Sequence, residues 1–365
     1  MRFVAAMAVF LSHSVAFFNA SGNSISMGPL VENGGYYGVI FFYTLSGFLI
    51  TFLLLREKDE TGTIALRKFY VRRALRIWPL YYLMTILSFC LLPHWLPGAV
   101  GPVGQSWLVA FLLYLFILPN IAMLTGYSSP ASFQLYTIGF EEQFYAFWPL
   151  VVRKTSSRPV ALLAVVFFLP LGFSLLHAYA HARHLLDHGG GWLIVKGMLT
   201  YIDYSSVPAF AAGGAAAYWY RRAGEAQLKI PGRKIWGYLL GGGLMLLMWF
   251  GKPWTPGYVN LLSVVFVLLI LHLIIRGRML SMVEQLFASG GRISYGIYVY
   301  HPVVMMGVSL CLSRIRVPGP PIVNYLLFML LSFACVLLIA SLSYRFFERR
   351  FLRKRSTAAI FQGQS

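Results

Sequence analysis

Acidic residues and cysteines are scarce in this sequence. Its 365 residues include 11 Asp and Glu against 30 Lys and Arg, and three cysteines, Cys90, Cys311 and Cys335, that have no paired spacing. These cysteines imply neither a disulfide framework nor a zinc knuckle. A phosphate-binding loop, a glycine-rich dinucleotide motif, an internal repeat and a long polar stretch are also missing, so the sequence predicts neither a nucleotide-binding domain nor an appended soluble domain.

Hydrophobic residues make up 58% of the sequence and charged residues only 11%. This composition does not fit one soluble core, whereas runs of about 20 apolar residues fit helices that cross a bilayer. We predict an all-α, polytopic transmembrane bundle of about ten spanning helices, with a membrane domain at 1–351 and a basic cytoplasmic tail at 352–365. The candidate spans are 2–19, 36–55, 77–93, 105–124, 134–152, 160–178, 194–218, 235–251, 258–276, 293–313 and 322–343.

Basic residues gather between these spans, as the positive-inside rule describes, so the positive charge does not call for a nucleic acid partner. The basic loops are 67–76, 153–158, 221–234, 276–292 and the tail from Arg345. Placing all of them and both termini in the cytoplasm requires an even number of crossings, but the candidate spans number eleven. The conflict falls on residues 93–134, and either 105–124 or 133–152 is re-entrant or lies partly in the interface, or one basic loop faces outward.

Two polar residues in the first span share a helix face. Arg2 and His13 are eleven positions apart, which returns to within about 20° of the same direction on an α-helix and separates them by about 16 Å along its axis. With Arg2 at the cytoplasmic rim, His13 lies near mid-membrane. Its imidazole is then a candidate general base or relay, or a histidine satisfied by a hydroxyl of a neighbouring helix.

Further polar groups enter two other apolar stretches. In FEEQFYAFWPL, Glu141 and Glu142 point about 100° apart, so at most one faces a given cavity, and Glu142 is interpreted as an interfacial residue. In GGRISYGIYVYHPVV, Tyr295 fits a headgroup boundary, and His301 before a proline fits a helix-end group. Each of these patterns alone is weak evidence for a site.

Together the patterns resemble acyltransferase family 3, a family of integral-membrane O-acyltransferases. The resemblance is carried, in family order, by RFVAAMAVFLSH, GVIFFYTLSGFLIT, FYVRRALRIWPLYY, IGFEEQFYAFWPL, GGRISYGIYVYHP and SYRFFERRF. These blocks run from residue 2 to about residue 351. The sequence departs from the family at Tyr136 and Gly139, where the family usually has a Trp and a small Ser or Thr.

The resemblance implies transfer of an acyl group, usually acetyl, from cytoplasmic acyl-CoA to a carbohydrate hydroxyl. It implies acetyl-CoA or another acyl-CoA as donor substrate, with no tightly bound cofactor. It makes His13 the catalytic histidine, Arg2 its partner on the same helix face, and Glu141 the family's glutamate. Tyr145, Tyr295 and His301 are assigned to a further part of the site.

A basic cluster after the second span matches the family's basic motif. Arg72, Arg73 and Arg76 fall on one side of a helix, and guanidinium groups bind phosphates bidentately, so this cluster is expected to hold the phosphates of the donor. Ser46 and Gly47 are expected to let the thioester approach closely. His13 then either deprotonates the acceptor hydroxyl directly or accepts the acyl group transiently, with Arg2 or Glu141 setting its protonation.

Four histidines in HAYAHARHLLDH form a separate pattern. If this segment is helical, His177, His181, His184 and His188 share one stripe, and histidines one turn apart can ligate a metal. The family motifs do not include the stripe. We therefore interpret it as an interfacial helix on the outer side or part of an acceptor-binding rim, and predict no metal site.

The sequence favours a multi-pass enzyme of a bacterial inner membrane that acts on a surface or exported polysaccharide. Its expected partners are acyl-CoA, the carbohydrate acceptor and the lipid bilayer, and a periplasmic or glycan-assembly partner is left open. Two alternatives stay open: the same chemistry on a small secondary metabolite or lipid, and a non-catalytic glycan or lipid transporter. A transporter is expected to show paired half-helices or a pseudo-repeat, and the sequence shows neither.

Overall fold

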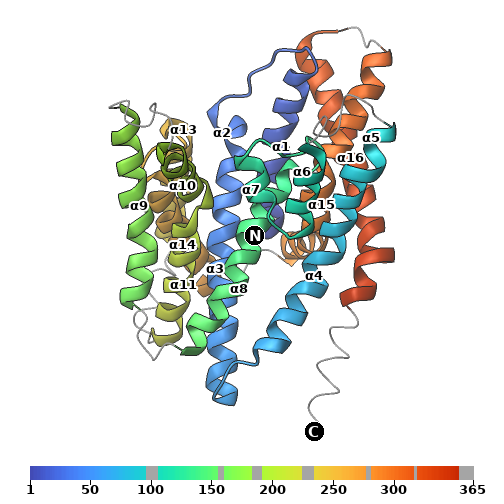
Figure 1. The fold of residues 1–365 in the computed structure, drawn as a ribbon. Coiled ribbons are helices and arrows are strands. Elements are labelled where there is room, and N and C mark those ends of the chain that lie inside the picture. The colour runs from blue at the N-terminus through green and yellow to red at the C-terminus, as the bar shows by residue number, and fades with distance from the viewer. Residues whose placement is uncertain are drawn as a thin grey trace. The chain divides into compact units, whose positions relative to one another are not determined.

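The computed structural model describes residues 1–95, 106–154, 160–182, 191–223, 234–276, 281–315 and 319–352. This part of the chain is almost entirely helical and contains no strand, which confirms the all-α prediction. The helices form two compact units, each built from segments far apart in the sequence (Figure 1). The first unit comprises Met1–Gly35, Ala65–Ala146 and Glu284–Ser365, and the second comprises Tyr36–Ile64 and Phe147–Val283.

The first unit brings the N-terminal helix beside the C-terminal helices. Helix α1 contacts both α2 and α16, although α16 lies at the other end of the sequence. The 3-10 turn η2 follows α7, and two π-helical turns, η1 and η3, extend α4 and α16 without a break. Its helices are α1 (Arg2–Ala20), α2 (Pro29–Glu32), α4 (Leu66–Ile86), η1 (Leu87–Leu91), α5 (Leu92–Trp95), α6 (Ser106–Leu115), α7 (Pro119–Leu124), η2 (Phe133–Leu135), the first part of α8 (Tyr136–Lys154), most of α15 (Ser281–Ile315), α16 (Pro321–Ser343) and η3 (Tyr344–Glu348).

The second unit is centred on a helix rich in alanine and glycine, α11, which packs on both α9 and α14. Small side chains allow this, because they let helix backbones approach closely. The helices of this unit are most of α3 (Gly34–Thr61), the end of α8, α9 (Val160–Ala182), α10 (Gly191–Ser205), α11 (Val207–Arg222), α13 (Lys234–Phe250) and α14 (Tyr258–Arg276).

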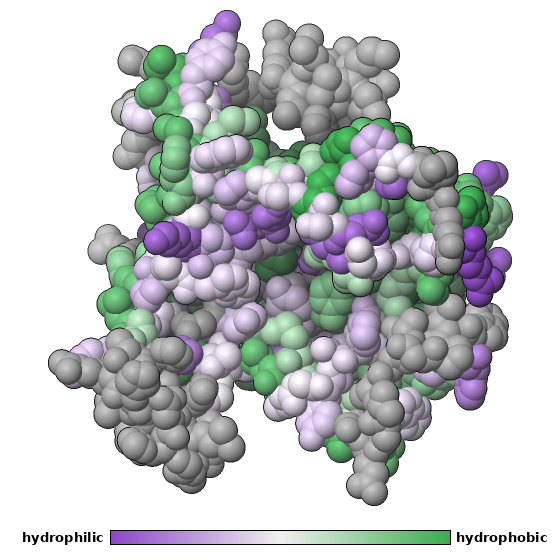
Figure 2. Space-filling view, turned by 90° about the horizontal axis from the view of Figure 1, so that it is seen from above, coloured by the Kyte–Doolittle hydropathy of each residue, from purple (hydrophilic) through white to green (hydrophobic). Residues whose placement is uncertain are grey.

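The exposed surface of the helices is apolar, as expected of a membrane protein. Phe250 is 75% exposed and Tyr238 74%, and only 6% of the apolar window of α9 is buried. Seven of the described helices are long and apolar enough to cross a membrane, and α13 is a shorter apolar helix. On the face seen from above, hydrophilic side chains gather in patches beside hydrophobic ones (Figure 2). The protein is therefore a membrane protein whose surface is shaped for lipid contact.

Two of the expected spans are broken. The described part of 105–124 consists of α6 and α7, which are separated at Ile117, a residue with φ of 58°. The ten-residue α6 is about 15 Å long, half of the hydrocarbon thickness, so 105–124 is not one straight span. Helix α8 is continuous over 19 residues, but it is not among the seven described helices that are long and apolar enough to cross a membrane, so the alternatives for the crossing conflict stay predictions. The span at 194–218 is likewise interrupted at Ser206, with φ of 47°.

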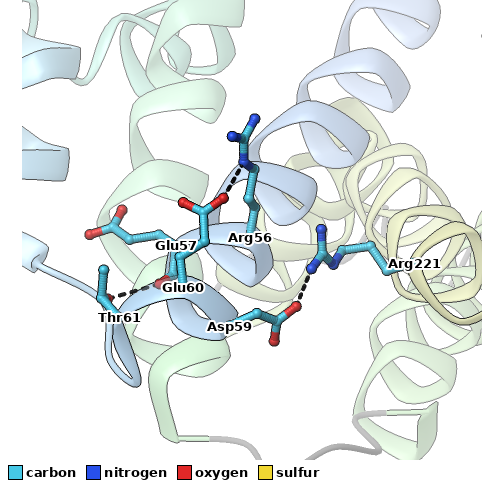
Figure 3. A network of polar contacts seen from close by, with 6 residues as sticks. All are labelled: Arg56, Glu57, Asp59, Glu60, Thr61 and Arg221. Atoms are coloured by element: carbon cyan, nitrogen blue, oxygen red, sulfur yellow. Dashed lines mark hydrogen bonds and ion pairs between the residues drawn. The ribbon is translucent and has the colours of Figure 1, made fainter.

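Three helix ends meet in the second unit, those of α3, α8 and α11. Arg221 of α11 forms an ion pair with Asp59 of α3 (Figure 3). The ammonium group of Lys58 donates to the carbonyl oxygens of Val152 and Arg153 at 3.0 and 3.1 Å, which satisfies carbonyls that the end of α8 leaves without helical partners. The basic loops that follow α8 and α11 therefore begin at the same end of this unit, as the positive-inside pattern predicts.

Gly47 of α3 allows a close helix crossing in the second unit. A Cβ at position 47 would lie 2.3 Å from the carbonyl oxygen of Phe210, and a Cβ at Gly213 would lie 2.1 Å from that of Thr44. The backbone of α11 therefore approaches α3 closely at Gly47, and this packing requires a glycine there. The expected contact of Ser46 and Gly47 with the donor stays a prediction.

We expect Gly47→Ala to destabilise the second unit by about 1–3 kcal/mol, because the added methyl group forces α3 and α11 apart. The measurement is the midpoint of thermal or detergent-induced unfolding of the purified protein. Gly241→Ala on α13 is the matched control, since no atom lies within 4 Å of the added Cβ there. Equal midpoints for the two variants would contradict the assignment.

Candidate active site

His13 is paired with His301 inside the first unit. His13 Nδ1 lies 2.7 Å from Nε2 of His301, and the two rings stack with centroids 5.0 Å apart. His301 is only 1% exposed, and Phe133 covers another side of the His13 ring at 5.1 Å. The structure thus joins a histidine of the first helix to one that lies 288 residues later.

A proline explains why His301 is oriented as it is. Pro302 lies within α15 and has no backbone N–H, so the carbonyl of Tyr298, four residues earlier, lacks its helical donor. The ring nitrogen Nδ1 of His301 lies 2.8 Å from this carbonyl oxygen and donates to it. The interpretation of His301 as a helix-end group is wrong, because α15 continues to Ile315.

This hydrogen bond determines the proton positions of the neutral pair. With Nδ1–H of His301 committed to a carbonyl, its Nε2 is an acceptor, so Nδ1–H of His13 is the donor between the rings. Nε2 of His13 then carries a lone pair. A Cβ at Gly35 would lie 3.5 Å from this nitrogen, so a glycine leaves room next to it. The arrangement presents an imidazole that can accept a proton.

A hydrogen bond holds the loop after α1 against Ser12, the residue before His13. Ser12 Oγ donates to the backbone carbonyl of Glu32 at 2.6 Å. The Glu32 carboxylate accepts from Ser26 Oγ at 2.6 Å and from the Met27 N–H at 3.0 Å, and these bonds lower the pKa of that carboxyl below its ordinary value. A lowered pKa means that the loop is stabilised at neutral pH, and that this stabilisation is lost as the pH falls through the pKa of the folded state.

Arg2 and Glu141 belong to a second cluster in the first unit. Tyr145 donates a short hydrogen bond to the Glu141 carboxylate, and Arg73 lies over the Tyr145 ring at 5.3 Å. Arg76 interacts electrostatically with Arg2, Arg73, Tyr145 and Glu141. Of the three arginines expected to act together, Arg73 and Arg76 enter this cluster.

The structure adds a partner that the sequence did not assign to His13, because His301 is hydrogen-bonded to it. The expectation that Arg2 or Glu141 sets the protonation of His13 stays a prediction. Tyr295, also expected near the site, donates to the Ile77 carbonyl at 2.9 Å and so joins α15 to α4. Arg2 and Glu141 therefore lie with the basic residues of α4.

Glu142 and Glu348 are more enclosed than the sequence indicates. Glu142 accepts from the indole N–H of Trp78 at 2.9 Å, and its Oε1 is buried without a hydrogen-bond partner in the described structure. Glu348 is 8% exposed, accepts from Ser343 Oγ at 3.2 Å and interacts electrostatically with Arg76. No ion pair between Glu348 and Arg345 or Arg349 is found in the part of the chain described.

An aromatic pocket of about 290 Å³ lies in the second unit. The ring of Trp254 lies 4.6 Å from that of Tyr36 and 4.7 Å from that of Tyr204. Trp254 has φ of 70°, which is uncommon for a non-glycine residue. His177 also lines this pocket. The other members of the histidine stripe lie outside the described residues, except that the backbone of His181 belongs to the last turn of α9.

Two residues that position the histidine pair were not selected from the sequence, Pro302 and Gln134. Gln134 is fully buried and donates from Nε2 to the Val299 carbonyl at 2.6 Å, next to the turn of α15 that Pro302 opens. The dipeptide HP within a long apolar stretch was the signal for Pro302, because a proline inside a helix frees a carbonyl. Nothing in the sequence points to Gln134.

The fold and the buried histidine pair define a polytopic helical membrane protein with a potential proton acceptor. The model of the acyltransferase 3 family, an acyltransferase domain, matches residues 1–341. The chain therefore belongs to this family of acyltransferases.

Among curated proteins, the chain is similar to the peptidoglycan O-acetyltransferase OatA of Listeria monocytogenes, with 24% identity over 90% of this chain and 53% of the relative. It is also similar to the putative peptidoglycan O-acetyltransferase YrhL of Bacillus subtilis, with 31% identity over 37% of this chain and 23% of the relative. A putative O-acetyltransferase of Staphylococcus aureus is 32% identical over 33% of this chain and 20% of the relative. The chain thus spans about half the length of the first relative and less of the others. No solved structure matches the chain.

Proposed function

We propose that the protein is a membrane O-acetyltransferase that moves an acetyl group from acyl-CoA to a carbohydrate hydroxyl. The observation that carries the proposal is the His13 and His301 pair, in which a carbonyl freed by Pro302 orients one imidazole and leaves Nε2 of the other as a base. Membership of an acyltransferase family and similarity to proteins named as O-acetyltransferases support the same chemistry.

His13 acts as the general base in this proposal. Its Nε2 takes the proton of the acceptor hydroxyl as the oxygen attacks the thioester carbonyl, and the thiolate of CoA leaves and takes up the proton. His301 holds the imidazole in the required tautomer and interacts with the positive charge that develops on it. Arg73 and Arg76, beside Glu141 and Tyr145, bind phosphates of the donor.

The aromatic pocket of the second unit is proposed to bind a sugar of the acceptor. Aromatic rings pack against the C–H faces of sugars, and the pocket also offers hydroxyl and amide groups, among them Thr200, Thr255 and Asn260. Trp254 and Tyr204 supply the rings. This composition fits a carbohydrate better than the acyl chains of a lipid, which have no groups for such hydrogen bonds.

Transfer is tested with membrane vesicles from cells that express the protein and from cells that lack it. Acetyl-CoA labelled in the acetyl group is supplied at the cytoplasmic side, and label is measured by mass spectrometry in glycans, in lipids and in small molecules. Ester-linked label in a glycan is the expected result. Label in lipid or small molecules alone would overturn the carbohydrate acceptor, and no expression-dependent label in any fraction would overturn acyl transfer from this donor.

We expect Trp254→Ala to raise KM for the acceptor by about 2- to 12-fold, because a stacked aromatic ring contributes about 0.5–1.5 kcal/mol. KM for acetyl-CoA is expected to stay unchanged. Trp249→Ala on α13 is the matched control, since Trp249 is also half exposed but lies outside the pocket. A change in donor KM with an unchanged acceptor KM would contradict the assignment.

A further inference from the structure

A large cavity in the first unit lies apart from the histidine pair. It measures about 830 Å³ and is formed by the start of α1, the α15 residues around Arg292, and the end of α16 with η3. One part of its lining is basic, with Arg292, Arg345 and Arg349, and another part is apolar, with Phe3, Phe333 and Leu337. None of the described residues that line it is acidic.

The basic part of the cavity is suited to an anion. All three guanidinium groups belong to exposed side chains. Arg292 donates to Ser289 at 3.2 Å and Arg345 lies over the ring of Phe346 at 5.4 Å, and neither contact neutralises charge. No ion pair of these three arginines is found among the residues that the structure describes. Three positive charges around one cavity attract phosphate, which guanidinium groups bind through paired hydrogen bonds.

The apolar part of the cavity continues onto the lipid-facing surface of α16. Phe333 and Leu337 line the cavity, while Leu330 and Leu338 of the same helix are 58% and 60% exposed. Only 22% of the apolar window of Pro321–Leu352 is buried, so this helix presents most of its surface to the surroundings. A ligand in the cavity can therefore bind through its phosphate while its hydrocarbon chains follow α16.

We propose that this cavity binds an anionic phospholipid. The phosphate lies among Arg292, Arg345 and Arg349, and the acyl chains pack on Phe333 and Leu337. Basic pockets between transmembrane helices are a recognised way of binding anionic headgroups. Free phosphate compounds, including CoA, share the anionic part of this chemistry but have no hydrocarbon chain for the apolar wall. The proposal does not depend on the acyl-transfer reaction.

The site is also placed to stabilise the start of α1. Phe3 lines the cavity, and a Cβ at Gly290 would lie within 3.0 Å of three atoms of its ring, so α1 and α15 pack tightly there. A lipid in the cavity would contact α1, α15 and α16 together. Binding to the folded state alone raises its stability, so the melting temperature is expected to rise with the lipid concentration.

The test uses the full-length protein purified in a mild detergent, with dioleoylphosphatidylglycerol, dioleoylphosphatidylcholine or CoA added. Native mass spectrometry measures the lipid retained, and thermal unfolding measures stabilisation. The test variant is R292Q/R345Q/R349Q. The charge-matched control is R56Q/R153Q/R314Q, which removes three exposed arginines outside the cavity.

The unmodified protein and the control are expected to retain phosphatidylglycerol at least 10-fold better than phosphatidylcholine, and the test variant is expected to lose this preference. Equal retention of phosphatidylglycerol by test and control variants would overturn the proposal. Displacement of the lipid by CoA would also overturn it and identify a site for the donor's phosphates.

A second measurement needs no variant, in case the triple substitution prevents folding. Phosphatidylglycerol with a photoreactive group in its acyl chain is cross-linked to the unmodified protein, and the labelled peptides are mapped. Label around Phe333 and Leu337 of α16 is expected, with competition by unlabelled phosphatidylglycerol. Label spread over all lipid-facing helices without competition would show ordinary solvation by lipid and overturn the proposal.

Discussion

Replacement of His13 by alanine is expected to lower the rate of acyl transfer by about 10²- to 10⁴-fold, the usual contribution of a general base. The reason is structural. Nδ1–H of His13 is bonded to His301, so Nε2 of His13 carries the lone pair that can accept a proton. The measurement is the initial rate of transfer from labelled acetyl-CoA in membrane vesicles, at equal amounts of protein in the membrane. KM for the donor is expected to change little.

Substitutions of His301 test the same arrangement more sharply. In the proposal His301 is a positioning residue, because it acts on the reaction through the imidazole of His13. His301→Ala removes the acceptor for Nδ1–H of His13 and is expected to lower kcat and change its pH dependence. His301→Gln offers both an amide donor for the Tyr298 carbonyl and an acceptor oxygen, so it is expected to recover part of the rate. If alanine and glutamine at position 301 behave alike, the orienting role is wrong.

The control for both histidines is His272→Ala. His272 is 3% exposed, lies on α14 in the second unit, and has no place in the proposed reaction. Its removal tests whether loss of any buried imidazole reduces activity through folding. A fall in rate like that of His13→Ala, at equal protein levels and equal melting temperature, would contradict a catalytic role specific to His13.

Replacement of Arg76 by alanine is expected to raise KM for acetyl-CoA by about 10- to 100-fold, because a charge-assisted hydrogen bond contributes about 1.5–3 kcal/mol. Arg76 interacts electrostatically with Arg2, Arg73, Glu141 and Tyr145, and also with Glu348. The measurement is the dependence of the initial rate on donor concentration. Arg76→Lys is expected to be intermediate, since lysine keeps the charge but loses the bidentate geometry.

Arg67→Ala is the control, because Arg67 lies in the first turn of α4 and is exposed. Its KM for the donor is expected to stay close to that of the unmodified protein. A lower kcat with an unchanged donor KM in Arg76→Ala would contradict phosphate binding. It would instead show that Arg76 acts on the reaction through Glu141.

The bounds of several helices were predicted closely from the apolar runs in the sequence. The expected spans at 2–19 and 258–276 correspond to α1 (Arg2–Ala20) and α14 (Tyr258–Arg276), because a long apolar run has few alternatives to a helix when no water is present to satisfy its backbone. The breaks at Ile117 and Ser206 were not predictable in the same way. A residue with positive φ leaves no hydropathy signal, and neither residue is a glycine or a proline.

The candidate site was predicted only as a set of separate residues. His13, His301 and Glu141 were all selected from the sequence, but His13 was expected to act with Arg2 or Glu141. Arg2 and His13 lie on the same face of α1, but about 16 Å along the helix axis separates them. The partner of His13 comes from α15, and no local pattern specifies which distant helix packs against α1.

The sequence by itself determined the membrane environment, the helical class and the family, because each depends on composition, on the length of apolar runs and on motifs that are local in the chain. It also contained the proline that frees the Tyr298 carbonyl. Only the tertiary structure decided that His13 pairs with His301, that Arg2 joins Arg76 and Glu141, and that Gly47 serves helix packing. These contacts join residues far apart in the chain, and their geometry depends on how whole helices pack in the folded protein.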